Sequence, residues 1–145
     1  MPPVRVLVDG FNLLHAVVLH GEDRRGWWSA AHQSRVVELV EGFSGERLRR
    51  YEAARGPEHA LDPAVDIELV VVFDAARPNS PRCPPSPSVD VCFAPDADAW
   101  IVEQAAGAAG SRVIVVSRDR ALQNRLHRHG VERMRPRHFE RLCRE

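Results

Sequence analysis

Four aspartates stand just beyond short apolar runs that are typical of β-strands. They are Asp9 after Val4–Val8, Asp74 after Leu69–Phe73, Asp98 after Val89–Phe93 and Asp119 after Val113–Val116. A single aspartate in such a place is commonly a turn former or a helix cap. If the four runs are parallel strands, their carboxyl ends share one edge of the sheet, which brings the four carboxylates together.

Carboxylates held close together repel one another, and some of them take up protons unless a positive charge lies between them. Mg²⁺ and Mn²⁺ supply that charge and prefer oxygen ligands. Zinc sites commonly include histidine, which is absent beside these aspartates in the sequence. An oxygen-only site with one or two such ions is typical of enzymes that act on phosphoryl groups. The pattern therefore predicts a Mg²⁺ or Mn²⁺ site whose ligands and catalytic residues are Asp9, Asp74, Asp98 and Asp119.

The rest of the chain alternates between strand-like and helix-like segments. Helical segments are expected from Phe11, between Ser29 and about Glu41, over about 45–55, from Asp96 or Asp98 to about Ala109, from Asp119 to Arg128, and from Pro136 onward. The stretch 79–88 holds four prolines and is expected to be a loop, and Val131–Met134 is expected to be an edge strand. Strands that alternate with helices predict the α/β class with a mainly parallel sheet of roughly five strands.

Composition places few limits on the function but excludes some classes. All 20 basic residues are arginine, so lysine chemistry such as a Schiff base or a P-loop is excluded. The formal net charge is zero, yet residues 112–145 hold ten arginines against four carboxylates, a net charge of +6. Three widely spaced cysteines predict reduced thiols. No membrane span or signal peptide is predicted, so we expect a cytoplasmic protein without a membrane partner.

Four segments resemble, in the same order, the signature segments of NYN domains, which are PIN-like nucleases. The segment Val8-Asp9-Gly10-Phe11-Asn12 resembles their VDGYN opening, and Val72-Phe73-Asp74-Ala75 their VFDA segment. Ala97-Asp98 followed by Ile101 resembles the start of their acidic helix, and Val116-Ser117-Arg118-Asp119 their T/S-x-D signature. The ordered set spans most of the chain and is most similar to the YacP-like subgroup of bacterial ribonucleases.

The resemblance implies a three-layer α/β/α PIN-like fold over residues 1–145 as a single domain. It also implies a divalent metal ion and cleavage of RNA phosphodiester bonds, with the four aspartates as metal ligands. Asn12 would orient Asp9 or contact the substrate, and Ser117 would support the ligands from behind. The chain departs from the family in Phe11, which replaces a tyrosine, in a long stretch over 43–66 and in the proline-rich loop.

Several charged residues near the aspartates have two interpretations. Asp96 either caps the helix that holds Asp98 or adds a further ligand from outside the main set. Arg77 either touches a phosphate or is a solvated loop residue. Arg118, Arg120 and Arg125 either bind the phosphates of the substrate or form a solvated helix face.

Aromatic residues and histidines carry weaker signals. Trp27 and Trp28 either stack on a base or pack against the fold. Of the seven histidines, none is singled out as catalytic.

The leading hypothesis is a metal-dependent endoribonuclease, with RNA as the substrate and the ribosome as a candidate partner. One alternative is a HAD-type phosphatase, which needs a second aspartate two residues after the nucleophile, whereas Phe11 occupies that position after Asp9. The other alternative is a catalytically inactive RNA- or ribosome-binding module, which the complete set of four aspartates disfavours.

Overall fold

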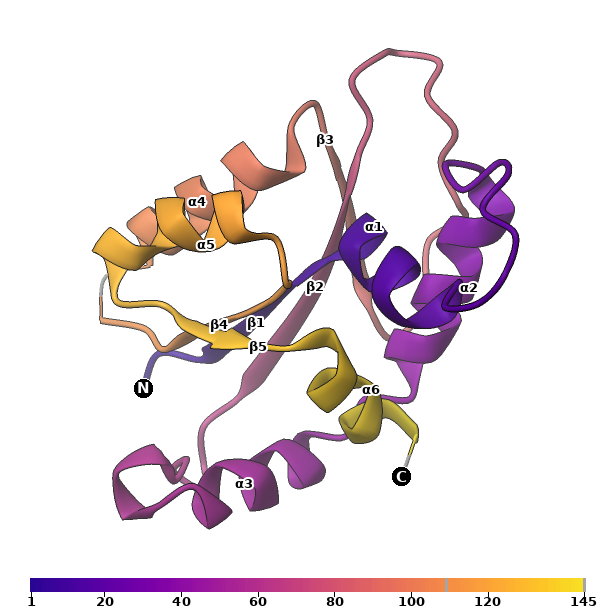
Figure 1. The fold of residues 1–145 in the computed structure, drawn as a ribbon. Coiled ribbons are helices and arrows are strands. Elements are labelled where there is room, and N and C mark those ends of the chain that lie inside the picture. The colour runs from indigo at the N-terminus through magenta and orange to yellow at the C-terminus, as the bar shows by residue number, and fades with distance from the viewer. Residues whose placement is uncertain (109, 145) are drawn as a thin grey trace.

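The computed structural model describes residues 1–108 and 110–144, and within them five parallel strands form one sheet. The order is β3-β2-β1-β4-β5 (Figure 1), with bounds β1 Val4–Asp9, β2 Ile67–Asp74, β3 Asp90–Ala94, β4 Val113–Val116 and β5 Glu132–Met134. In the central register Val8 lies between Val71 of β2 and Val116 of β4. The chain adds β2 and β3 on one side of β1 and then β4 and β5 on the other, so the strand order reverses beside β1.

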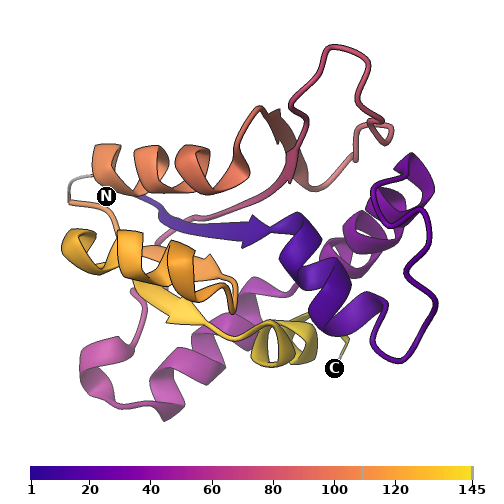
Figure 2. The same ribbon diagram turned by 45° about the horizontal axis from the view of Figure 1, so that its top comes forward.

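Helices cover both faces of the sheet, which gives the three layers that the resemblance implies (Figures 1 and 2). One face carries α1 (Gly10–Leu13), a π-helical turn (Leu14–Val18), α2 (Ala30–Glu41), α3 (Gly45–Ala54) and α6 (Pro136–Arg144). The other face carries α4 (Ala97–Gly107) and α5 (Arg120–Leu126). Val6 and Val8 pack into the first core and Leu7 into the second, so β1 is buried on both faces and its sequence reads as an unbroken apolar run.

Most predicted boundaries agree with the structure to within one or two residues. The helix expected from Phe11 is instead a short α-helix followed by the π-helical turn. The helix expected from Asp119 to Arg128 begins at Arg120 and ends at Leu126, and a 3₁₀ turn follows over His127–His129. Gly130 then adopts φ 63°, a left-handed conformation that glycine tolerates and that ends the helical segment. The expected end of the preceding helix at Ala109 lies outside the described residues; the helix ends at Gly107.

The long stretch over 43–66 holds α3 and a 3₁₀ turn at Pro57–His59. Its buried Glu52 accepts hydrogen bonds from Arg55 and Arg112, and Arg112 also pairs with Glu132 of β5. These ion pairs attach α3 to the ends of the sheet.

The proline-rich loop connects β2 to β3, and the buried side chain of Gln33 attaches it to α2. The Gln33 amide donates to the backbone oxygens of Trp28 and Pro81 and accepts from the backbone N–H of Cys83.

In the described part of the chain no helix is both long enough and apolar enough to cross a membrane.

Candidate metal centre

The strand ends place the four predicted aspartates along the carboxyl edge of the sheet. Asp9 is the last residue of β1 and Asp74 the last of β2. Asp98 lies in the first turn of α4, and Asp119 is the N-cap of α5. The edge lies where the strand order reverses beside β1, which is the usual ligand site of open parallel sheets. A cavity of about 280 Å³ opens there, and it is lined by Asp9, Phe11, Asn12, His15, Trp27, Asp74, Asp96, Asp98 and Asp119.

Three of the four carboxyl groups form a close cluster. Asp9, Asp98 and Asp119 each offer a carboxylate oxygen, and these oxygens lie within 4.8 Å of one another. Asp74 lines the same cavity outside this group, where its carboxylate accepts a hydrogen bond from the backbone N–H of Ala97 at 2.8 Å. The structure therefore separates the predicted ligand set into three clustered carboxylates and one at the rim.

Asp96 is the N-cap of α4, the first of its two interpretations. Its side chain accepts a hydrogen bond from the backbone N–H of Ala99 at 3.0 Å. It also lines the aspartate cavity, so it adds negative charge near Asp98.

Ser117 and Asn12 connect the elements that carry the carboxylates. The buried Ser117 hydroxyl donates to Asp9 Oδ2 at 3.1 Å and accepts from the backbone N–H of Asp119 at 3.1 Å. The side-chain oxygen of Asn12 accepts from the backbone N–H of Arg118 at 2.9 Å, and the backbone N–H of Asn12 donates to Asp9 Oδ1. These bonds fix Asp9 and the β4–α5 loop relative to each other.

The carboxyl groups lack enough positive charge to remain ionised together. Burial, followed by repulsion from Asp98, raises the pKa of Asp9 to about 7, although Ser117 and Asn12 lower it in part. Burial also raises the pKa of Asp98, and repulsion from Asp119 and Asp74 adds to that effect. A proton or a cation is therefore required at this edge of the sheet near neutral pH.

A second cluster of acidic residues in the protein differs from the aspartates, because arginines neutralise its carboxylates. Glu52, His59 and Glu132 also lie within 4.8 Å of one another, but Arg112 pairs with both glutamates and Arg55 with Glu52. In residues 1–108 and 110–144, no salt bridge reaches any of the five aspartates that line the cavity. Clustered oxygen donors without an internal cation fit a hard divalent ion such as Mg²⁺ or Mn²⁺.

Phe11, His15 and Trp27 form an aromatic wall of the cavity, and neither Phe11 nor His15 was predicted from the sequence to be a site residue. Trp27 packs edge-on against Phe11 and His15 with ring centroids 5.0 Å apart in each pair. In the described structure Nδ1 of His15 is buried without a hydrogen-bond partner. The signal for His15 was its position three residues after Asn12, which is one helical turn away. Trp28 lies outside the lining and is 53% exposed.

The four predicted phosphate-binding arginines are exposed and lie outside the cavity lining. Arg125 is near enough to Asp98 to oppose the rise in the pKa of that carboxyl group, and Arg118 helps lower the pKa of His15. Arg120 is the first residue of α5. Arg77 lies in the loop after β2, where its backbone N–H donates to the Ser80 hydroxyl.

Comparison with known proteins gives a family and a fold. A family model for the YacP-like NYN domain matches residues 62–145. The fold is similar to the crystal structure of Rae1 (YacP) from Bacillus subtilis, a W164L mutant, with a TM-score of 0.58 and 20% sequence identity. That similarity covers 97% of this chain and 74% of the other. No curated protein matches this chain significantly.

Proposed function

Because the chain belongs to the YacP-like NYN family, we propose that it is a metal-dependent endoribonuclease that hydrolyses RNA phosphodiester bonds. The proposed centre consists of Asp9, Asp74, Asp98 and Asp119. The observation that carries the proposal is the cluster of carboxylate oxygens within 4.8 Å, with which no basic side chain among the described residues forms a salt bridge. An unbalanced cluster of this kind is costly to the fold and suits a centre that binds divalent ions.

Each residue of the centre has a proposed part. Asp9, Asp98 and Asp119 hold Mg²⁺ or Mn²⁺, and Asp74 adds negative charge at the rim. When bound, the ion supplies positive charge to the phosphate oxygens and makes nearby water more acidic. Ser117 keeps Asp9 and Asp119 in place through its two hydrogen bonds. Asn12 keeps the β4–α5 loop against α1.

The substrate must be held beside a surface that repels phosphate. We propose that Arg118, Arg120 and Arg125 bind phosphates that flank the scissile bond, because all three follow β4 or lie on α5 next to Asp119. Trp27 offers an aromatic surface inside the cavity on which a base can stack.

Cleavage of a labelled single-stranded RNA tests the proposal. Wild-type protein should cleave it internally with Mn²⁺ and not with EDTA, and Asp9→Asn and Asp98→Asn should reduce cleavage to background. Asp90→Asn is a matched control, because Asp90 is exposed at the start of β3 and outside the cavity. RNA binding by the wild type without cleavage in Mg²⁺ or Mn²⁺ would instead indicate a binding module. Hydrolysis of phosphomonoesters alone would indicate a phosphatase.

A further inference from the structure

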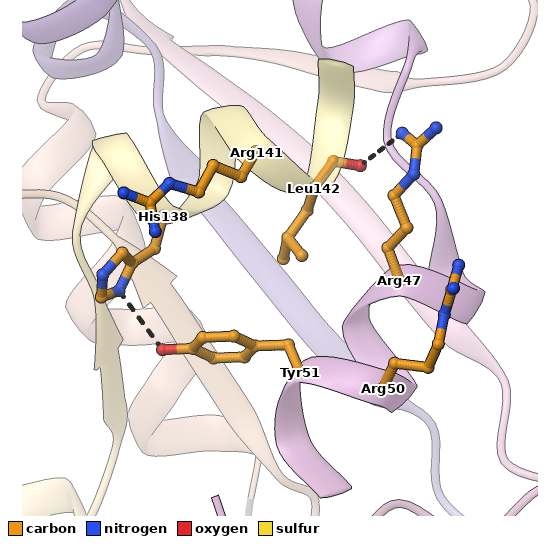
Figure 3. A pocket seen from close by; sticks show the side chains of 6 residues that line it. All are labelled: Arg47, Arg50, Tyr51, His138, Arg141 and Leu142. Carbon is orange, nitrogen blue, oxygen red and sulfur yellow. Dashed lines mark hydrogen bonds between the residues drawn. The ribbon is translucent and has the colours of Figure 1, made fainter. Parts of the chain in front are cut away.

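A basic groove lies between α3 and α6, apart from the aspartate centre. Its cavity of about 490 Å³ is lined by Arg47, Arg50 and Tyr51 of α3 and by His138, Arg141 and Leu142 of α6 (Figure 3). None of these residues lines the aspartate cavity. The two helices pack on the face of the sheet opposite α4 and α5 (Figure 1).

Contacts between the two helices fix the sides of the groove. Arg47 donates a hydrogen bond to the backbone oxygen of Leu142 at 3.3 Å, and the Tyr51 hydroxyl bonds to His138 Nδ1 at 3.3 Å. Figure 3 shows both bonds, with Tyr51 and Arg47 on the α3 side, His138 and Leu142 on the α6 side, and Arg50 beyond Arg47. The groove is therefore a built feature, and its shape does not depend on exposed arginines alone.

Two of its arginines have charge available for a ligand. Arg50 and Arg141 are exposed, and no carboxylate of residues 1–108 and 110–144 forms a salt bridge with either. Arg137 and Arg144 of the same helix differ, because both pair with Glu140, at 3.3 and 3.0 Å. On α6, Arg137 and Arg144 thus share the carboxylate of Glu140, whereas Arg141 of the groove has no salt-bridge partner among the described residues.

Guanidinium groups with free donors match the oxygens of a phosphate, to which they can donate two hydrogen bonds at once. The half-buried ring of Tyr51 adds an apolar surface suited to a sugar or base. We propose that the α3–α6 groove is a second RNA-binding site, which holds backbone phosphates of the strand away from the aspartate centre. This inference rests on the proposed function, because only a polynucleotide substrate offers phosphates at both places.

Binding without metal lowers the contribution of the aspartate centre, because its carboxylates then repel RNA, and it leaves the groove and the arginines beside Asp119 as the sites for phosphates. The probe is an oligouridylate of about thirty nucleotides, titrated in EDTA at several salt concentrations. Arg50→Ala/Arg141→Ala should weaken binding about tenfold and lower the logarithmic salt slope by roughly 1.4, or about 0.7 for each lost phosphate contact. Thermal unfolding of each variant checks that the fold is retained.

Arg137→Ala/Arg144→Ala is the matched control, since it also removes two guanidinium groups, but from positions on α6 that do not line the groove. It also removes both salt-bridge partners of Glu140, whereas the change in net charge is the same in the two double variants. If this control keeps the affinity and the salt slope of the wild type, the assignment of the groove as an RNA-binding site is supported. Equal losses in both double variants would mean that binding follows net charge alone, and would overturn it.

Three further results bear on this inference, and the last two separate it from the proposed function. If polyglutamate of similar length competes with the RNA as well as unlabelled oligouridylate does, the groove selects negative charge and is not an RNA site. If the wild type cleaves RNA while the two double variants bind it equally, the α3–α6 groove is not an RNA-binding site, and the proposed function is unaffected. If no RNA is cleaved but the RNA affinities of the double variants differ as expected, the proposed nuclease function is wrong, and the groove is still supported as an RNA-binding site.

Discussion

At the scale of single residues, Asp9 combines burial, hydrogen bonds and repulsion from neighbouring carboxylates. The residue is 6% exposed, and its carboxyl group lies close to those of Asp98 and Asp119 and accepts hydrogen bonds from Ser117 and from the backbone of Asn12. Hydrogen bonds alone do not offset its burial, because its pKa still rises to about 7. The residue is therefore oriented for a ligand at the expense of stability in the metal-free protein.

This balance predicts a pH dependence of stability in metal-free buffer. The pKa of Asp9 is about 7 in the folded protein. In the unfolded chain it is about 3.9, so the folded state holds the proton more tightly. The stabilisation is complete below about pH 4 and is lost as the pH rises through about 7.

Asparagine cannot titrate, so Asp9→Asn should gain stability relative to the wild type by up to ~4 kcal/mol between pH 4 and pH 8. Urea unfolding in EDTA at several pH values measures this difference. Asp90→Asn should show no comparable trend. A difference between wild type and Asp9→Asn that is independent of pH would contradict the assigned electrostatics.

At the scale of elements, a close approach of α1 to β2 holds Asp9 and Asn12 in position. A Cβ atom on Gly10 would lie 2.5 Å from the Phe73 ring and 2.9 Å from the backbone oxygen of Val72. Packing thus requires glycine at position 10. The family resemblance had identified this segment from its sequence without giving that reason.

Gly10→Ala should force α1 away from β2 and cost about 2 kcal/mol of stability, as overpacking of a core commonly does. RNA cleavage should fall as well, since Asn12 and the cavity wall move with α1. Gly107→Ala is the control, because a Cβ there meets nothing within 4 Å. Denaturant unfolding compares the two, and equal stabilities would show that α1 tolerates the displacement.

Local sequence signals predicted helices and strands well where a single local feature, such as an apolar run or a capping residue, determines the element. The buried strands read as apolar runs, Ser29 caps α2 through the backbone N–H of His32, and Gly42 ends that helix. The π-helical turn after α1 has no local signal of this kind. The pairing of Arg112 with Glu52 joins residues 60 positions apart, so only the assembled sheet brings them together.

The candidate site shows the same division. The places of the four aspartates follow from strand ends in a parallel sheet, and Ser117 lies between β4 and α5 as its motif implied. The separation of Asp74 from the other three, and the presence of His15 in the wall, depend on how the helices pack. The catalytic and phosphate-binding roles of these residues stay predictions.

At the scale of the whole molecule, charge is divided along a neutral chain. Residues 112–145 carry a net charge of +6 and the remainder −6. Phosphate binding needs positive charge, and ions at the aspartates neutralise only the centre. If the substrate is RNA, as we propose, we expect arginines to contact the phosphates that flank the centre.

Replacing Arg118, Arg120 and Arg125 together by alanine should weaken the binding of single-stranded RNA in Ca²⁺. It should also lower the logarithmic salt slope by up to about 2, or roughly 0.7 for each lost contact. Lysine at the three positions keeps the charge and should largely keep the slope. The measurement is the affinity for RNA at several salt concentrations. If the triple alanine variant has the same salt slope as the wild type, these arginines are a solvated helix face and do not bind phosphates.

The most direct test of the central claim is calorimetric titration of Mn²⁺ into the metal-free protein near pH 6, in two buffers with different heats of ionisation. The wild type should bind Mn²⁺ and release about one proton, because Asp9, with its pKa of about 7, is mostly protonated before the ion enters. Asp98→Asn should lose most of the affinity, and Asp90→Asn should bind as the wild type does. Absence of Mn²⁺ binding by the wild type, or equal binding by Asp98→Asn, would contradict the assignment of this aspartate cluster as a metal centre.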